Sequence, residues 1–197
     1  MTPAQRMAAT ARLLCNAPDP WEFAKTVGKS QDIGVFLGAL DDYFEACGVE
    51  HFTAFEVCTM SSSSQDVAKR MKADKSMHRG QYVEPLPIWL WQPMAALLVG
   101  FCDPIRKALG APVTFRNGLR QWAVNQQVAS SGIMSDHPNT ACADLDLSRD
   151  GDLDAAHRTA RALYDLHGTT QGVSLGQGDT VIHIGIHSPM GHRKWTY

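Results

Sequence analysis

Two stretches in the C-terminal half of the chain decide the fold: ACADLDL (Ala141 to Leu147) and VIHIGIH (Val181 to His187). In both, small or branched apolar residues alternate with polar or ligand-type residues. This period of two is the side-chain period of a β-strand. Each stretch therefore predicts a strand with one apolar face and one face that carries ligand-type side chains.

The apolar faces of these strands are expected to share one core, and pairing the strands then places Asp144 beside His183 on the opposite face. His137 approaches from the preceding loop, SDHPNT. Catalytic zinc is commonly held by three nitrogen or oxygen ligands, with a further position open to solvent. His137, Asp144 and His183 can supply such a set for Zn²⁺, although a lone strand histidine is more often a hydrogen-bonded core residue. His187 lies about 13 Å farther along a regular strand and is not expected to bind the same ion.

Two helices are predicted around these strands. Asp152 or Asp154 can cap a helix that ends in the turn-rich stretch HGTTQG. An apolar stripe over residues 94–109 predicts the second helix, which Pro104 should kink or divide. Both helices have the apolar spacing needed to cover a sheet.

The flanking segments complete the predicted architecture. Residues 1–48 show two short helical patterns separated by NAPDP (Asn16 to Pro20), and Pro112 to Phe115 is typical of strand entry. The serine-rich segment from Ser61 to Tyr82 indicates an exposed loop with one short helix. We therefore expect an α+β fold with helices packed on one side of a mainly antiparallel sheet: residues 1–48 form an N-terminal helical extension and residues 49–197 the main domain.

Composition excludes several classes of protein. The 197 residues are 44% hydrophobic and 19% charged, with a net charge of −2, so neither disorder nor nucleic-acid binding through bulk charge is expected. The longest apolar stretch, Ile88 to Phe101, is interrupted by Gln92 and Pro93, so no membrane span is expected. The five cysteines form no CxxC pair, which indicates reduced thiols and no thiolate zinc site.

Several motifs follow one another in the order and spacing of a known family. They are HFTAFEV (His51 to Val57), DPIRKALGAPV (Asp103 to Val113), GLR (Gly118 to Arg120), Asn125, SDHPNTACAD (Ser135 to Asp144), VIHIGI (Val181 to Ile186) and HRKW (His192 to Trp195). Together they resemble the zinc D-alanyl-D-alanine peptidase family, which includes bacterial carboxypeptidases, murein endopeptidases and phage endolysins and shares its zinc fold with hedgehog. The resemblance covers about residues 50–197 and implies a hedgehog-like peptidase fold there.

The resemblance also implies roles for individual residues. It makes His137, Asp144 and His183 the zinc ligands and Arg120 the cation that holds a substrate carboxylate or carbonyl. Ser135 would support the histidine loop and line the substrate cleft. Zinc lowers the pKa of a water molecule that it holds, and a fixed guanidinium stabilises negative charge on a substrate. Without the neighbouring motif, Arg120 would be interpreted as a surface helix charge.

The sequence departs from the family pattern in four places. Thr140 stands where the family usually has Gly, Cys142 where it has Ala, and Gly185 where many relatives have Asp. Relatives also place an acidic or histidine general base shortly before the last zinc ligand, often at the position of Thr180. Asp179, one residue earlier, is the candidate for this base, and its alternative role is that of an ordinary turn residue.

The resemblance implies a zinc-dependent peptidase that hydrolyses amide bonds in the stem peptides or cross-links of peptidoglycan. The departures keep open an alternative, namely a catalytically inactive structural or cell-wall-binding protein, such as a virion component, that retains the fold and the metal. Residues 1–14 lack the pattern of a secretory signal. We therefore expect synthesis in the cytoplasm, followed by release to the wall with a lysis partner or transport within a phage virion.

Overall fold

The computed structural model describes residues 17–30, 32–59, 61–70, 76–120, 122–127, 135–189 and 191–197. The first of the two predicted N-terminal helices, over residues 8–15, lies outside these ranges. The elements, in chain order, are α2 (Pro20–Ala24), α3 (Ile33–Cys47), α4 (Ala54–Cys58), α5 (Ser62–Arg70), β1 (Ser76–His78), β2 (Gln81–Val83), η1 (Ile88–Leu90), α6 (Trp91–Leu97), η2 (Leu98–Cys102), α7 (Asp103–Leu109), β3 (Val113–Asn117), α8 (Trp122–Asn125), β4 (Cys142–Leu147), α9 (Leu153–Gln171), β5 (Ser174–Gln177), β6 (Val181–Gly185) and β7 (Arg193–Thr196).

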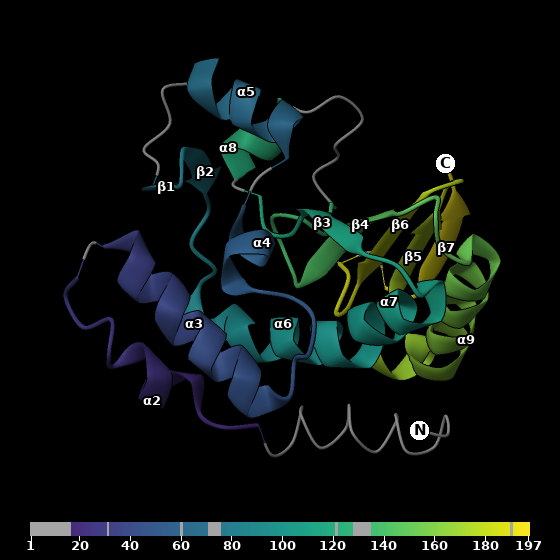
Figure 1. The fold of residues 1–197 in the computed structure, drawn as a ribbon, viewed down its shortest axis with the longest axis horizontal. Coiled ribbons are helices and arrows are strands. Elements are labelled where there is room, and N and C mark those ends of the chain that lie inside the picture. The colour runs from purple at the N-terminus through teal and green to yellow at the C-terminus, as the bar shows by residue number, and fades with distance from the viewer. Residues whose placement is uncertain are drawn as a thin grey trace.

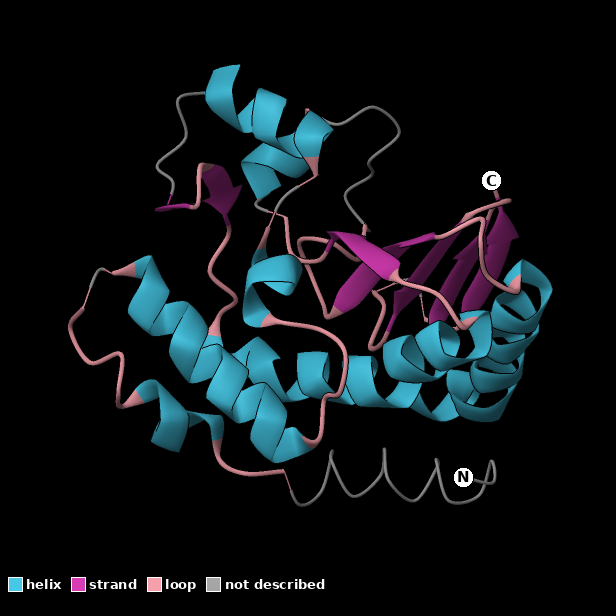
Figure 2. Ribbon diagram, in the orientation of Figure 1, coloured by secondary structure: helices cyan, strands magenta, loops and turns pink. Residues whose placement is uncertain are grey.

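A sheet with the strand order β3-β4-β6-β5-β7 lies in the C-terminal half of the described chain (Figure 1 and Figure 2). The two predicted strands pair antiparallel as β4 and β6, with Asp144 directly opposite His183. The other pairs are also antiparallel except at one edge, where β7 runs parallel to β5. The predicted α+β class is therefore confirmed, with a sheet that is mixed at this edge.

Alternation along the strands separates a core face from a functional face. Leu145, Ile182 and Ile184 are fully buried in the main hydrophobic core. The helices α7 and α9 pack against each other along one side of the sheet and contribute to that core (Figure 1). Because successive side chains in a strand point to opposite faces, Asp144 and His183 stand on the other side of the sheet.

The helix from Ile88 to Leu109 is continuous despite Pro104. A π-helical turn, η2, ends at Cys102 and directly precedes α7, in which Pro104 takes the second position. A proline has no N–H to donate and clashes with the carbonyl four residues earlier, and the wider π turn relieves both problems. By length and apolar composition, this 22-residue helix is long enough to cross a membrane, but its most apolar window is 67% buried inside the protein, as in a core helix.

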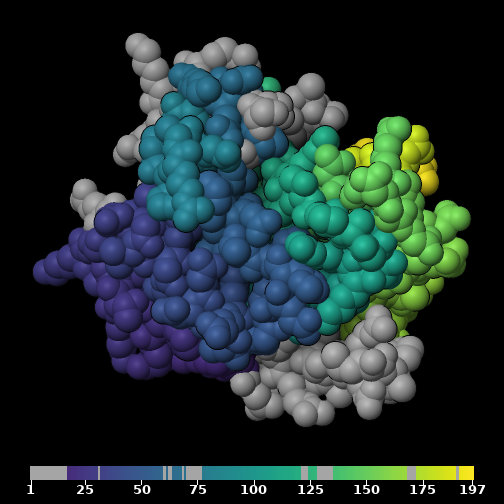
Figure 3. Space-filling view, in the orientation of Figure 1, coloured from purple at the N-terminus to yellow at the C-terminus, as the bar shows by residue number. Residues whose placement is uncertain are grey.

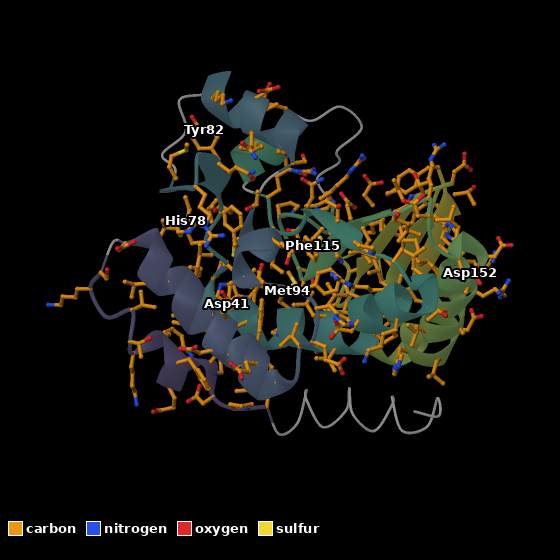
Figure 4. All side chains as sticks on the ribbon, viewed as in Figure 1. Asp41, His78, Tyr82, Met94, Phe115 and Asp152 are labelled. Carbon is orange, nitrogen blue, oxygen red and sulfur yellow. The ribbon has the colours of Figure 1, made fainter. Side chains whose placement is uncertain are left out.

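The N-terminal helices pack onto the central helix. Tyr43 and Phe44 of α3 are buried, and the ring of Tyr43 lies 5.7 Å from that of Trp91 in α6. Met94 of α6 and Phe115 of β3 are buried in the same hydrophobic core and are labelled near the middle of the molecule in Figure 4. In the space-filling view, the atoms of α3 form one continuous surface with those of the segments that follow it in the chain (Figure 3). The helix α3 therefore contributes to the same core, and a folding unit that ends at residue 48 remains a prediction.

Two details differ from the sequence prediction. The segment expected to be a loop with one short helix contains α5 and also the hairpin β1-β2. The helix α9 begins beside Asp152, whose carboxylate accepts the N–H of Ala155 at 2.8 Å, as predicted (Figure 4). It continues through HGTTQ and stops only before Gly172, which has a φ of 56°. A left-handed glycine ends a helix more effectively than turn-forming residues inside it do.

Candidate metal centre

Three side chains from two strands and a loop converge on the functional face of the sheet. One potential ligand atom from each of His137, Asp144 and His183 lies within 4.8 Å of the other two. Asp144 Oδ2 is 3.1 Å from His137 Nε2, and Asp144 Oδ1 is 2.7 Å from His183 Nδ1. Both histidines are buried. The predicted convergence is confirmed, and the cluster could bind a metal ion.

The backbone explains why these groups meet. The antiparallel register of β4 and β6 makes Asp144 and His183 direct partners. The loop that carries His137 is held at both ends, because the N–H of Arg120 donates to the His137 carbonyl at 3.0 Å and the hydroxyl of Thr140 donates to the Ile186 carbonyl. Thr140, which stands where the family that the sequence resembles usually has glycine, thus ties the loop to the end of β6.

Both imidazole rings have an acceptor at the nitrogen that faces away from the cluster. His137 Nδ1–H donates to the Gly118 carbonyl at 2.8 Å, and His183 Nε2–H donates to Asp136 Oδ2 at 2.9 Å. Carbonyl and carboxylate oxygens only accept, so each outer nitrogen carries a proton. His137 Nε2 and His183 Nδ1 can then offer their lone pairs to a metal, which is the arrangement typical of histidine ligands in metalloproteins.

The carboxylate of Asp136 is the functional group that the sequence pattern does not reveal. Its side chain is fully buried. It accepts hydrogen bonds from the hydroxyls of Ser174 and of Ser188, the latter at 2.6 Å, and a guanidinium nitrogen of Arg193 lies 3.6 Å away. An aspartate directly before a candidate zinc histidine is the one sequence signal that could have indicated it.

The cluster holds its protons tightly when no metal is bound. Burial opposes a positive charge on His137, but Cys142 and Asp144 outweigh it and raise its pKa to about 10. Burial likewise opposes the charge on His183, whereas hydrogen bonds to Asp136 and Asp144 raise its pKa to about 9. Although burial would raise the pKa of Asp144, the two imidazolium neighbours hold it well below its usual value. A metal ion must therefore displace protons from the inner nitrogens.

Strand β7 adds an aromatic wall beside the cluster. In the sheet register, His183 is opposite Gly176, and Gly176 is opposite Trp195. A Cβ atom at position 176 would come within 2.5 Å of the Trp195 indole, so only glycine lets this ring lie across the sheet. The Trp195 and His183 ring centroids are 5.3 Å apart, and the Arg193 guanidinium is 4.8 Å from the Trp195 ring.

Arg120 and Ser135, the two predicted substrate-binding residues, are both held by hydrogen bonds within the structure. Arg120 is only 6% exposed and donates to the Asn125 side chain at 3.0 Å, while the negative charge of Asp144 partly offsets the lowering of its pKa by burial. Ser135 is half-buried, and its carbonyl accepts the Asn139 side-chain amide at 2.6 Å, which supports the loop. Its contact with a substrate remains a prediction.

Asp179 lies in the turn between β5 and β6 and is exposed. Its carbonyl faces His157 of α9, at 3.2 Å from the imidazole Nε2. It precedes His183 by four positions in the sequence. The structure therefore gives Asp179 the position of a turn residue, and its role as a general base remains a prediction.

Two further departures from the family pattern have a clear structural setting. The Cys142 thiol is 3.2 Å from Nδ1 of His137, the nitrogen on the outer side of the ring, and burial raises the pKa of the thiol. Cys142 is therefore a neighbour of the cluster and not part of it. At Gly185, a side chain would meet Asp136 Oδ2 at 3.0 Å, so the carboxylate of Asp136 fills the space that the glycine leaves.

No protein-family model, curated protein or solved structure is significantly similar to this chain.

Proposed function

We propose that the protein is a zinc-dependent peptidase that hydrolyses amide bonds in the stem peptides or cross-links of peptidoglycan. The observation that carries this proposal is the set of His137 Nε2, Asp144 and His183 Nδ1, with the outer nitrogen of each ring held by an acceptor. Two imidazoles and one carboxylate form a common ligand set of catalytic zinc, whereas Ca²⁺ and Mg²⁺ prefer oxygen ligands alone. The donor set therefore fits zinc.

The choice of substrate rests on the sequence resemblance and on Arg120. The resemblance to the zinc D-alanyl-D-alanine peptidases assigns this residue to a substrate carboxylate or carbonyl. The guanidinium of Arg120 is buried and donates a hydrogen bond to the Asn125 side chain. The negative charge of Asp144 partly offsets the lowering of the Arg120 pKa by burial. A guanidinium fixed in this way can orient a stem peptide without further loss of side-chain freedom. A hedgehog-like zinc fold belongs to the same proposal.

Different residues of the chain have different roles in the proposed reaction. Zinc, when bound, would lower the pKa of a water molecule towards about 7 and polarise a carbonyl group. Asp144 holds both imidazoles through its two oxygens, so the donor atoms are arranged before any ion arrives. Arg120 positions the substrate, Trp195 lies against the His183 ring, and Asp179 is the proposed acceptor of the proton.

The proposed setting is the bacterial cell wall. We place the protein either with a lysis partner that releases it to the wall or in a phage virion, as the family resemblance implies. The test is to incubate purified protein with isolated cell walls, with and without zinc, and to follow the release of new amino groups. Zinc-dependent release that is lost in Arg120→Ala would support the peptidase, and a full zinc site with no release would reject it.

A second candidate is a metal-binding structural or cell-wall-binding protein without turnover. The position of Asp179 in an exposed turn beside α9 favours it, because a general base must reach the reacting water. Co-sedimentation with cell walls in the absence of amino-group release would identify this second function.

A further inference from the structure

We propose that Asp136 is a positioning residue of the metal centre: it accepts the Nε2 proton of His183 and thereby turns Nδ1 of that ring towards His137 and Asp144. This inference rests on the proposed metal site and assigns a residue outside its ligand set. Asp136 acts through His183 and does not itself bind the metal.

The two carboxylates that contact His183 have different surroundings. Asp144 Oδ1 lies 2.7 Å from Nδ1, and its other oxygen is shared by His137 at 3.1 Å and the Asn117 side-chain amide at 3.1 Å. Asp144 therefore belongs to the cluster on the inner side of the ring. Asp136 Oδ2 lies 2.9 Å from Nε2, on the outer side. Only Asp144 is on the side where a metal would lie.

The partners of Asp136 fix it in place. Ser174 from β5 and Ser188 from the segment after β6 each donate a hydroxyl to it, and Arg193 at the start of β7 supplies a nearby positive charge. The side chain has no exposed surface. A buried carboxylate with three such partners keeps one strong acceptor position for the His183 N–H and has no freedom to rotate away.

The backbone of β6 is shaped for this contact. A Cβ at Gly185 would lie 2.8 Å from Ser174 Oγ, 3.0 Å from Asp136 Oδ2 and 3.2 Å from Cys142 Cβ. A side chain at position 185 would therefore crowd both Asp136 and Ser174, which donates to it. After the strand, exposed His187 adopts a left-handed conformation with a φ of 56°, and the next residue, Ser188, reaches back to Asp136. Gly185 therefore leaves room for the Asp136 carboxylate, and the turn at His187 brings a hydrogen-bond donor to it.

Loss of the acceptor should release the ring. Without Asp136, the outer nitrogen of buried His183 would lose its charged partner, and the two tautomers would become closer in energy. Outer acceptors of metal-bound histidines typically contribute 10- to 100-fold to metal affinity. We expect Asp136→Ala to bind zinc about 10- to 100-fold more weakly than the wild type.

Asp136→Asn is the conservative variant. Its amide oxygen can still accept from His183, and its amide nitrogen can donate to the hydroxyl oxygen of Ser188. It should therefore keep the tautomer of the wild type and recover most of the zinc affinity lost in Asp136→Ala. Asp146→Asn is the matched control, because Asp146 lies on the same strand as Asp144 but pairs with Arg116. It should bind zinc like the wild type.

The experiment combines zinc affinity, measured by competition with a chelating dye, with the tautomer of His183, read from long-range ¹H–¹⁵N NMR spectra of the zinc-loaded protein. Wild type should show Nδ1 bound to metal and Nε2 protonated, and Asp136→Ala should lose both this pattern and affinity. Should Asp136→Ala fail to fold, Ser188→Ala, which removes one donor to Asp136, should show a smaller loss of affinity. Wild-type affinity and tautomer in Asp136→Ala, or wild-type affinity in Ser188→Ala where Asp136→Ala does not fold, would overturn this inference alone. A wild type that binds no zinc would overturn the proposed function with it.

Discussion

Substitution of His137 by Asn separates the ligand atom of this residue from its structural hydrogen bond. His137 is 7% exposed, its Nδ1–H donates to the Gly118 carbonyl at 2.8 Å, and its Nε2 is 3.1 Å from Asp144. The side-chain amide of asparagine lies near the position of Nδ1 and can still donate to Gly118, but nothing replaces Nε2. We therefore expect His137→Asn to fold and to lose its response to zinc.

The size of the response follows from mass action and from the size of the chain. An ion that binds only the native state, at a free concentration 100-fold above its Kd, stabilises that state by about 2.7 kcal/mol. For a domain of this length, 1 kcal/mol shifts Tm by about 2 to 4 °C, so zinc should raise the wild-type Tm by about 5 to 10 °C. In the absence of zinc, His137→Asn should cost about 1 to 3 kcal/mol, because Asp144 loses one charged hydrogen-bond partner.

The assay is differential scanning calorimetry of chelator-treated protein, repeated after addition of zinc. His157→Asn is the matched control, because His157 lies on α9, contacts Gln177 and is outside the cluster. Its zinc-induced shift should equal that of the wild type, whereas the shift in His137→Asn should fall to near zero. An equal shift in His137→Asn and the wild type would refute the ligand assignment.

Three other predictions follow from the same geometry. Gly185→Ala should lower the free energy of unfolding by about 1 to 3 kcal/mol, because the new methyl group crowds Asp136; urea unfolding that matches the wild type would contradict this packing. Arg120→Lys should raise KM for stem peptides and leave zinc affinity unchanged, because an ammonium cannot reproduce the guanidinium contacts; steady-state kinetics and dye competition test both parts. The zinc-induced rise in Tm should be larger at pH 8 than at pH 6, because zinc must displace protons from His137 and His183. The raised pKa values of these histidines stabilise the metal-free fold fully below the unfolded pKa of 6.5. This stabilisation is lost as the pH rises towards the folded pKa values of about 10 for His137 and about 9 for His183. A shift independent of pH would show that zinc does not displace these protons.

The part of the site that depends on local pattern could be predicted from the sequence. Strict alternation over ACADLDL and VIHIGIH predicted both strands and the faces that their side chains occupy. Since the two apolar faces must be buried in one core, the proximity of Asp144 and His183 could be expected, and the structure adds the antiparallel register that makes them direct partners. The loop position of His137 came from the motif in which it lies.

The parts that depend on distant contacts could not be predicted. The parallel strand β7, the packing of α3 on α6 and the π turn before Pro104 each result from contacts that no local period records. Asp136 is the clearest case, because its partners Ser174 and Ser188 are 38 and 52 residues away in the sequence. Spacing likewise placed Asp179 near His183 along the chain without showing that it lies in an exposed turn.

The central claim is that His137, Asp144 and His183 bind one metal ion. The most direct test is a crystal structure of the zinc-loaded protein with anomalous diffraction data collected on both sides of the zinc absorption edge. We predict a single strong anomalous peak within bonding distance of His137 Nε2, Asp144 and His183 Nδ1. A peak elsewhere, or no peak in crystals grown with zinc, would contradict the account.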